Sequence, residues 1–241
     1  MLTLAIAKYS KELRLSRNIA DMSTRIQAGS HQEYLLKLLQ SELQHRDVAR
    51  KEKLLKNAGF YAIKTFETFL FDEVTLPSSI DEQYLKRLEF MDSKTNLVMY
   101  GNVGTGKTHL SIAIGVEACK KGLDVKFFRT STLVNKLAEA KNRGALSVFI
   151  KQLNKADLLI CDEWGYVPLD RTGAQLLFEV ISECYEKKSI IINTNIEFSR
   201  WVNVFYDEQM TGAMIDRILH HCHLLMFPGQ SNRMRESSLS Q

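Results

Sequence analysis

The segment Gly101-Asn-Val-Gly-Thr-Gly-Lys-Thr108 determines how the rest of this 241-residue chain is interpreted. It fits the pattern Gly-x-x-x-x-Gly-Lys-[Ser/Thr] and lies between a strand-like apolar run at 96–100 and a helix-like run that reaches residue 121. Glycines let the backbone curl so that its N–H groups point inward at the start of the helix. The sequence therefore predicts a phosphate-binding loop. Its expected contact residues are Gly101, Asn102, Val103, Gly104, Thr105, Gly106, Lys107, Thr108 and His109.

Two side chains at the end of this loop predict how a nucleotide is held. Lys107 is expected to reach the β- and γ-phosphates of ATP, and the Thr108 hydroxyl is expected to bind Mg²⁺. A chance glycine-rich turn could show the same residues, but the strand before it and the helix after it favour a P-loop. ATP and Mg²⁺ are therefore the predicted cofactors.

Two adjacent carboxylates, Asp162 and Glu163, follow an apolar run that begins at Leu158. A buried strand cannot hide these carboxylates in its interior, so we expect them at the carboxyl edge of a sheet, where open α/β folds bind ligands. Asp162 is the predicted second ligand of Mg²⁺, and Glu163 the predicted base for the water that attacks the γ-phosphate. The alternative is a strand end with solvated acids.

Strand-like apolar runs alternate with helix-like runs through residues 79–241, which predicts an α/β domain with a parallel sheet. The expected strands are 96–100, 125–129, 158–162, 190–195 and 224–227. At the start of this region, Ser79 and Glu82 have the spacing of a capping box and predict a short helix.

Residues 1–58 predict a small all-helical domain, and residues 59–78 an aromatic-rich linker. The aromatic residues between Phe60 and Phe71 are expected to pack in the core or in the linker, and coverage of the adenine ring by part of them is the alternative. Ser30 and Glu33 have the spacing of a capping box at the start of the longest expected helix. Leucines behind that box form one apolar face, which we expect to pack inside a helical bundle. They are Leu35, Leu36, Leu38, Leu39 and Leu43.

The composition is that of an ordinary globular protein, with 45% hydrophobic and 25% charged residues. Its apolar runs are far shorter than the ~18 residues of a membrane span, and Lys8 and Lys11 interrupt the first of them before it could act as a signal peptide. We therefore expect a cytoplasmic protein without membrane contact. The four cysteines are widely spaced, which predicts neither a disulfide framework nor a structural zinc site.

The net charge of +4 is unevenly distributed along the chain. Residues 1–56 contain eleven Lys and Arg against six Asp and Glu, a balance of +5, and the remainder carries −1. Clustered cations suggest a polyanion such as nucleic acid, because binding releases counterions from the phosphates. A solvated helix face is the alternative.

The residues alone leave the roles of Asn195 and Arg217 open, and they disfavour a metal site at a histidine-rich run. Asn195, in the run Asn193-Thr-Asn195, could fix the attacking water or could be a polar turn residue. Arg217 could pair with Asp216 or could reach a neighbouring subunit's nucleotide as an arginine finger. The run His220-His-Cys-His223 cannot place all four side chains around one metal ion, because neighbouring residues of a helix or strand point in different directions.

With these residues in place, the chain resembles the IstB-type transposition helper ATPases of insertion sequences, AAA+ proteins similar to DnaA and DnaC. The resemblance extends from about Lys53 to Arg235 and includes more than the P-loop. It rests also on the segments 156–170, 193–195, 201–207, 214–221 and 229–233. It implies an AAA+ P-loop core with a parallel sheet, preceded by a short helical domain. Only 14 residues follow Phe227, so we expect no C-terminal helical lid.

The resemblance also implies roles for individual residues. Asn195 becomes the expected sensor and Arg217 the expected finger, while Lys136, Lys141 and Arg143 of a helix at 131–143 become candidate DNA contacts. A solvent-facing helix is the alternative for these cations. Two departures from the family pattern are Asn232, where a tyrosine is usual, and Cys161, where isoleucine is commoner. The first leaves a nucleotide-sensing role for Arg233 open.

The resemblance implies an ATPase that forms homo-oligomers on double-stranded DNA and recruits or stimulates the cognate transposase, with hydrolysis controlling disassembly. The nearest alternative is a DnaC-like loader of a replicative helicase, which would share the same core. A P-loop kinase for a small metabolite is disfavoured by Glu163, since a base beside the metal-binding acid suits hydrolysis. The same residue disfavours an adaptor that binds ATP without hydrolysing it.

Overall fold

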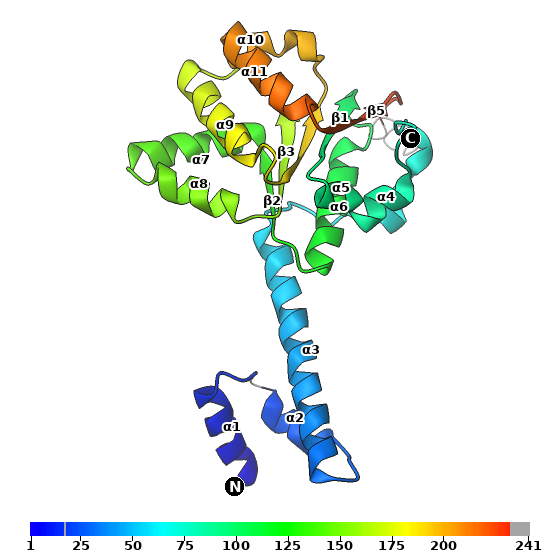
Figure 1. The fold of residues 1–241 in the computed structure, drawn as a ribbon, viewed down its shortest axis with the longest axis vertical. Coiled ribbons are helices and arrows are strands. Elements are labelled where there is room, and N and C mark those ends of the chain that lie inside the picture. Colours follow the sequence, from blue (N-terminus) through cyan, green and yellow to red (C-terminus); the bar gives the residue numbers. More distant parts are fainter. Residues whose placement is uncertain (17, 232–241) are drawn as a thin grey trace, which may run out of the picture. The chain divides into compact units, whose positions relative to one another are not determined.

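A computed structural model describes residues 1–16 and 18–231 of the chain (Figure 1). The chain divides between Lys53 and Leu54 into two units, which are described separately below. Our expected boundary follows residue 58. In the structure residues 54–58 belong to the second unit, where Ala58 is buried in a core cluster. Among the described helices, none combines the length and the apolar character that a membrane span requires.

The second unit contains a five-stranded parallel sheet with the strand order β2-β3-β4-β1-β5. The strands are β1 Asn96–Gly101, β2 Val125–Arg129, β3 Leu158–Trp164, β4 Ser189–Thr194 and β5 Cys222–Phe227. In this order β4 lies between β1 and β3, and because these strands are parallel, all three end at the same edge of the sheet. The predicted α/β fold with a parallel sheet is confirmed.

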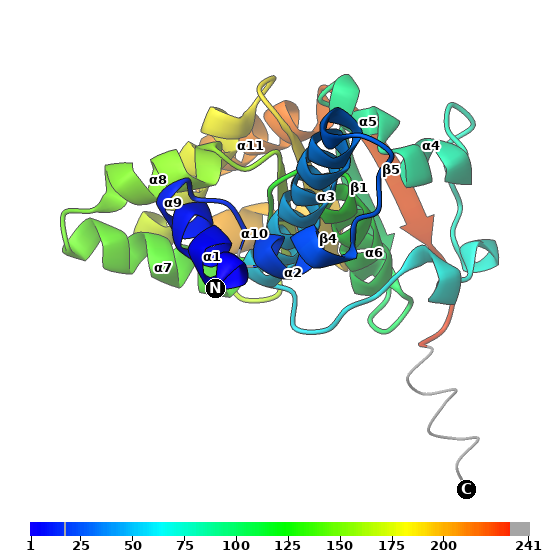
Figure 2. The ribbon, with the colours of Figure 1, turned by 90° about the horizontal axis from the view of Figure 1, so that it is seen from below.

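Helices cover both faces of this sheet. They are α4 Glu82–Arg87, α5 Glu89–Asp92, α6 Lys107–Lys120, α7 Thr130–Asn142, α8 Leu146–Asn154, α9 Arg171–Cys184, α10 Val202–Phe205 and α11 Glu208–Leu219. Both views of the ribbon show α7, α8 and α9 on one side of the sheet and α4, α5 and α6 on the other (Figures 1 and 2). The capping box expected at Ser79 is wrong. Asp81 caps α4, because its Oδ1 accepts a hydrogen bond from the Tyr84 N–H at 2.8 Å.

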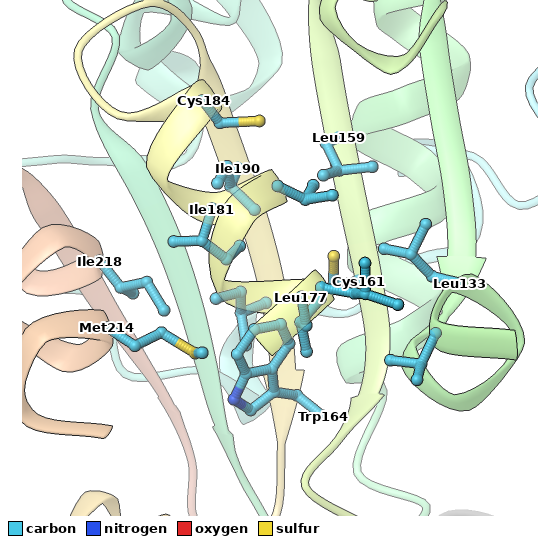
Figure 3. Close-up of a cluster of buried hydrophobic side chains, with 14 of the residues drawn as sticks. Leu133, Leu159, Cys161, Trp164, Leu177, Ile181, Cys184, Ile190, Met214 and Ile218 are labelled. Carbon is cyan, nitrogen blue, oxygen red and sulfur yellow. The ribbon is translucent and has the colours of Figure 1, made fainter. Parts of the chain in front are cut away.

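Side chains of β3 alternate between two core clusters, one on each face of the sheet. Ile160 belongs to the cluster that contains the apolar residues of α6, and Cys161 to the cluster that contains those of α9. Figure 3 shows Trp164 among other members of the second cluster, such as Leu177 and Met214. The Trp164 ring lies 5.5 Å from the ring of Trp201 and 5.3 Å from that of Phe205, measured between centroids. Because both faces are covered, the strand sequence is a continuous apolar run.

The segment from Ala58 to Thr75 pairs with both edges of the sheet. The Phe127 N–H of edge strand β2 donates to the Ala58 carbonyl at 2.7 Å, and Thr75 exchanges hydrogen bonds of 2.9 and 3.0 Å with Met226 of edge strand β5. An edge strand otherwise leaves backbone groups unpaired, so this pairing stabilises the sheet. Aromatic residues that we expected in a linker therefore pack on the core cluster beside α6. They are Phe60, Phe66, Phe69 and Phe71.

The first unit consists of α1 Leu2–Glu12, α2 Ile19–Arg25 and most of α3 His31–Asn57. The capping box at the start of α3 is present, with the Ser30 hydroxyl accepting from the Glu33 N–H at 3.1 Å. The Glu33 carboxylate reaches the Gly29 N–H at 2.8 Å, one residue earlier than the standard pattern.

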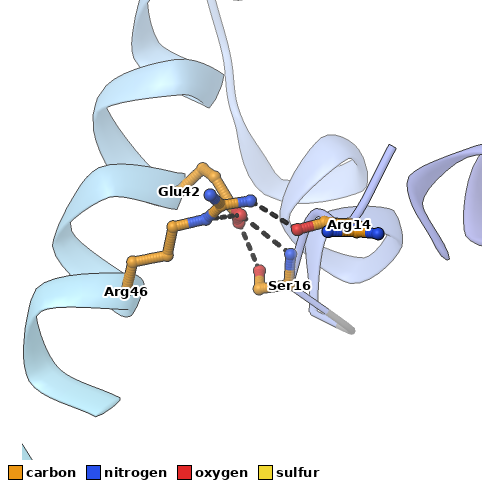
Figure 4. Close-up of polar contacts among 4 residues, drawn as sticks. All are labelled: Arg14, Ser16, Glu42 and Arg46. Carbon is orange, nitrogen blue, oxygen red and sulfur yellow. Dashed lines mark hydrogen bonds and ion pairs between the residues drawn. The ribbon is translucent and has the colours of Figure 1, made fainter. Parts of the chain in front are cut away.

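A buried carboxylate connects α3 to the loop after α1 (Figure 4). Glu42 accepts hydrogen bonds from the backbone N–H and the hydroxyl of Ser16 and from Nε of Arg46, whose Nη2 donates to the Arg14 carbonyl at 2.6 Å. Burial alone would raise the pKa of Glu42, but the hydrogen bonds from Ser16 and Arg46 outweigh it and lower the pKa. The first unit is therefore held in part by polar contacts.

The leucine face of α3 does not form the expected bundle core. The loop and α2 contact a different face of α3, which carries Tyr34 and Glu42, and the Tyr34 hydroxyl donates to the Ser23 carbonyl at 2.8 Å. The residues of the leucine face that remain exposed are Leu35, Leu36, Leu39 and Leu43. Periodicity located the apolar face correctly, but it could not show which face the neighbouring helix covers.

Candidate active site

The predicted phosphate-binding loop connects β1 to α6 at the carboxyl edge of the sheet. Gly104 and Gly106 have φ angles of 83° and 100°, in the left-handed region that favours glycine. A Cβ on Gly104 would lie 2.1 Å from Oγ of Ser231, and one on Gly101 would lie 2.2 Å from the Phe227 carbonyl oxygen. The loop is therefore packed tightly against the chain that follows β5.

Lys107 is buried at the first position of α6. Its Nζ donates to the carbonyl oxygens of Gly101 at 2.7 Å and Asn102 at 2.5 Å. The loop therefore holds the ammonium group beside the helix N-terminus, where phosphate oxygens are favoured. Thr105 supports the same turn through a 2.8 Å hydrogen bond from its hydroxyl to the Asn102 carbonyl.

The aromatic segment covers the start of α6. The Phe69 ring lies 5.3 Å from the His109 ring, and its Cε2 is 3.3 Å from the place where a Cβ on Gly106 would lie. Nε2 of His109 is 3.2 Å from the Thr65 carbonyl and from the Thr68 hydroxyl. Burial lowers the pKa of His109, which favours a neutral ring. The sequence predicts His109 at the loop, and Phe69 belongs to the aromatic cluster for which core packing, linker packing and coverage of an adenine ring were the alternatives.

Asp162 and Thr108 meet although 54 positions separate them in the sequence. The Thr108 hydroxyl lies 3.0 Å from Oδ1 and 3.1 Å from Oδ2 of Asp162, whose side chain is buried. The Asp162 backbone is also held, because the Thr130 hydroxyl donates to its carbonyl at 2.9 Å. The structure thus brings the two predicted Mg²⁺ ligands together, as hard oxygen donors beside the loop.

Asn193 is a site residue that sequence reasoning passed over in favour of Asn195. Its Nδ2 donates to Oδ1 of Asp162 at 2.9 Å and to the Ser111 hydroxyl at 2.8 Å, and the residue is 1% exposed. Its buried Oδ1 has no hydrogen-bond partner among the described residues. Asn195 is exposed and follows the end of β4. Alternation places Asn193 on the face of Ile191, which lies in the core cluster beside α6, but it gives Asn195 the same face. The two differ because β4 ends at Thr194, which leaves Asn193 inside the strand and Asn195 beyond it.

Glu163 points away from Asp162, as the sequence predicts for neighbouring residues of a strand. Its φ of 55° is unusual for a residue with a side chain and accompanies a register shift between Cys161 and Trp164. Oε1 of Glu163 lies 3.6 Å from Nε of Arg129 at the end of β2. Both side chains are about half exposed, so the Glu163 carboxylate is accessible to solvent.

Arg217 does not pair with Asp216, since no ion pair joins the two within the described part of the chain. Its Nη1 donates to the Ala213 carbonyl at 2.8 Å, and its guanidinium carbon lies 4.9 Å from the centroid of the Phe178 ring. These contacts hold the side chain between α11 and α9. Asn232 and Arg233, whose roles the sequence left open, lie outside the described residues.

The loop, the buried acid and its hydroxyl and amide partners form the site that a P-loop nucleotidase requires. The family of IstB-like ATP binding proteins matches residues 10–240. The chain belongs to this family. As an IstB-like protein it is an ATPase, and ATP is the nucleotide for its loop.

Curated relatives of this IstB-like ATPase come from insertion sequences. It is 36% identical to the ATP-binding protein of insertion sequence IS5376 from Geobacillus stearothermophilus, over 88% of this chain and 84% of the relative. It is 37% identical to that of IS21 from Pseudomonas aeruginosa, over 86% of this chain and 78% of the relative. The chain is therefore an ATPase of the kind that insertion sequences encode.

Solved structures with a similar fold include AMPPCP-bound DnaA from Aquifex aeolicus and the DnaC helicase loader. The DnaA match has a TM-score of 0.56 at 23% identity and covers 73% of this chain and 54% of that one. The DnaC match has a TM-score of 0.50 at 24% identity and covers 71% of this chain and 96% of that one. The predicted AAA+ fold is confirmed by this likeness together with the family.

Proposed function

We propose that this ATPase is a DNA-binding helper of transposition. It assembles as a homo-oligomer on double-stranded DNA, recruits or stimulates the transposase of the same element, and disassembles when it hydrolyses ATP. The observation that carries the catalytic part is the contact of Thr108 with Asp162, next to the accessible carboxylate of Glu163. The curated relatives from insertion sequences support the link to transposition.

The residues beside the loop fit a Mg²⁺ ion. Thr108 and Asp162 offer a hydroxyl and a carboxylate, the oxygen ligands that Mg²⁺ prefers, and Asn193 Oδ1 is a buried acceptor that could take a hydrogen bond from a water of the ion. When bound, Mg²⁺ neutralises charge that develops on the phosphates. Asn193 keeps Asp162 in position, and Lys107 exchanges its two carbonyl partners for phosphate oxygens.

Glu163 acts as the general base in this proposal. A carboxylate activates water by accepting one of its protons as the water attacks the γ-phosphate. The ion pair with Arg129 opposes that step, because Oε1 of Glu163 faces the guanidinium group at 3.6 Å and not a water molecule at the γ-phosphate. Glu163 must therefore turn away from Arg129 to act.

Asn195 and Arg217 remain proposed catalytic contacts. Asn195 is exposed just beyond β4, one strand away from Asp162, and is available to a nucleotide or to the attacking water. Arg217 contacts Ala213 and Phe178, neither of which belongs to the loop of this chain. We therefore propose that it serves a neighbouring subunit as an arginine finger.

The proposed DNA contact includes α7. Lys136, Lys141 and Arg143 are all exposed on this helix or directly after it. Lys136 lies over the Phe128 ring at 5.5 Å, and Arg143 is 4.0 Å from Glu139, so two of the three cations have only weak partners on the protein. Cations in this state are available to phosphates, and their contribution to binding falls with salt.

Assembly of the purified chain on duplex DNA tests this proposal. We expect co-sedimentation of protein and DNA with ATP and little without nucleotide, and capture of the transposase of the same element on the assembled complex. Lys136→Gln with Lys141→Gln should weaken DNA binding and reduce its salt dependence, while Lys120→Gln, on α6, serves as the control. Salt-independent binding would contradict the electrostatic contact. Capture of a replicative helicase instead of the transposase would favour the loader alternative.

A further inference from the structure

The histidine-rich run between α11 and β5 is divided by the fold. His223 faces Tyr84, with ring centroids 5.4 Å apart and Nε2 3.3 Å from the Tyr84 hydroxyl. Cys222 packs against the core cluster that contains Trp164. His220 and His221 remain exposed beside each other, with ring centroids 4.1 Å apart. Of the four side chains in this run, those of His220 and His221 are therefore placed to bind one ligand together.

A third group joins these two histidines from a distant part of the sequence. Glu186 lies in the turn between α9 and β4, and it offers a carboxylate oxygen to the same point. One ligand atom from each of Glu186, His220 and His221 lies within 4.8 Å of the others. The neighbouring cation Lys187 pairs with Glu183 at 3.1 Å, and Glu186 contacts Tyr185, the tyrosine whose hydroxyl also contacts His220.

The backbone and a neighbouring hydroxyl hold this cluster in place. The His221 carbonyl accepts from the Asn96 N–H of β1 at 2.8 Å, which fixes the end of the turn to the sheet. The Tyr185 hydroxyl lies 2.9 Å from Nδ1 of His220. A partner on one ring nitrogen orients the imidazole and leaves the other nitrogen for a metal, which is the arrangement of most metal-bound histidines.

We propose that Glu186, His220 and His221 form a surface site for a divalent transition-metal ion such as Zn²⁺. Two imidazoles and one carboxylate suit Zn²⁺ and Co²⁺, whereas Mg²⁺ prefers oxygen ligands alone. Three protein ligands leave a coordination position for water. The ion joins the turn before β4 to the turn after α11, the helix that carries Arg217. This site is separate from the P-loop and does not depend on the function proposed above.

Metal titration of the full-length chain without an affinity tag tests the proposal. Calorimetry with Zn²⁺ and visible absorption with Co²⁺ should each show a saturable site in the wild type. The variants His220→Ala, His221→Ala and Glu186→Gln should each weaken Zn²⁺ binding by at least about tenfold, and Tyr185→Phe should weaken it by about tenfold. His45→Ala removes an exposed histidine outside the cluster and should bind Zn²⁺ like the wild type.

Circular dichroism and ATP binding confirm that each variant is folded, and neither measurement depends on the metal site. Loss of the Zn²⁺ isotherm in folded His220→Ala and His221→Ala, with His45→Ala unchanged, supports the site. Absence of saturable Zn²⁺ binding in the wild type overturns it, and so does wild-type affinity in both folded histidine variants.

Discussion

Arg129 Nε lies 3.6 Å from Oε1 of Glu163, so the proposed base of the ATPase is held by a cation at the end of the neighbouring strand. Arg129 is also the residue directly before α7, the helix that carries the proposed DNA contacts. A ligand that binds at the start of α7 could therefore change the position of Arg129 and release Glu163. Arg129 thus connects the first turn of α7 to the residue proposed to activate water, while the proposed DNA contacts lie further along the helix, from Lys136 to Arg143.

Replacement of Arg129 by Gln tests this link. Both side chains are about half exposed, and exposed ion pairs contribute only ~0.2–1 kcal/mol, so we expect basal phosphate release without DNA to rise by up to about fivefold. Lys126→Gln serves as the control. Lys126 lies on the same strand as Arg129 but pairs with Asp124, so its replacement should leave the rate of phosphate release unchanged. A lower basal rate in Arg129→Gln would show that the arginine assists hydrolysis rather than restraining Glu163.

Substitutions of Asn193 and of Asn195 should affect the Mg²⁺ requirement of the ATPase differently. Asn193→Ala removes a hydrogen bond to Asp162, so the Mg²⁺ concentration for half-maximal ATPase activity should rise by at least ~10-fold. Asn195→Ala should lower kcat without changing the Mg²⁺ requirement, because Asn195 is exposed beyond the strand. Titration of Mg²⁺ at saturating ATP measures both effects. An unchanged requirement in Asn193→Ala would exclude its positioning role.

Asn193 and Asn195 show which site residues the sequence could predict and which it could not. The P-loop is a contiguous motif, and Asp162 and Glu163 end a continuous apolar run, so local pattern was enough to place them. Alternation gives Asn193 and Asn195 the same face, so choosing between them required the residue at which β4 ends. The strand ends at Thr194, and only the folded sheet shows that Asn193 is buried against Asp162 while Asn195 lies beyond the strand.

Long-range packing explains the other differences. The leucines of α3 are correctly aligned on one face, but polar contacts of Glu42 and Tyr34 place the neighbouring segments on another face. The aromatic residues of the 59–78 segment were expected in the core or in a linker, and nothing local shows that this segment also pairs with both edges of the sheet. Glu186 belongs to no sequence motif. It lies near His220 because β1 is the only strand between β4, which follows Glu186, and β5, which follows His221.

Substitution of Gly104 tests the tight packing of the phosphate-binding loop without changing any charge. Gly104→Ala places a Cβ 2.1 Å from Oγ of Ser231 at a φ of 83°, so the loop must distort and ATP affinity should fall by at least about tenfold. Gly212→Ala, inside α11 with open space around its Cβ, should instead stabilise the fold by ~0.5–1 kcal/mol. Nucleotide titration and thermal unfolding measure these outcomes. Wild-type ATP affinity in Gly104→Ala would contradict the tight packing of the loop.

The stability of the chain should depend on pH through His109. Burial lowers the pKa of His109 below its ordinary value of 6.5, so the folded chain binds fewer protons there than the unfolded chain. The stabilisation is complete above 6.5 and is lost as the pH falls through that value toward the folded pKa.

When the pH is lowered from about 7.5 to about 5, we therefore expect the free energy of unfolding to fall less in His109→Asn than in the wild type. Urea unfolding at the two pH values measures the difference. The pKa of His223 is also lowered by burial, so some pH dependence remains in the variant. His31→Asn, at an exposed position, should follow the wild type. Identical pH dependence in His109→Asn and the wild type would exclude this contribution.

Phosphate release by Glu163→Gln, measured beside ATP binding, tests the central mechanism most directly. The account predicts that this variant binds ATP with Mg²⁺ like the wild type and releases phosphate at least ~100-fold more slowly. Lys107→Ala should lose ATP binding itself, which separates the loop from the base. Wild-type turnover by Glu163→Gln would contradict the account, because the water would then be activated without the carboxylate at the end of β3.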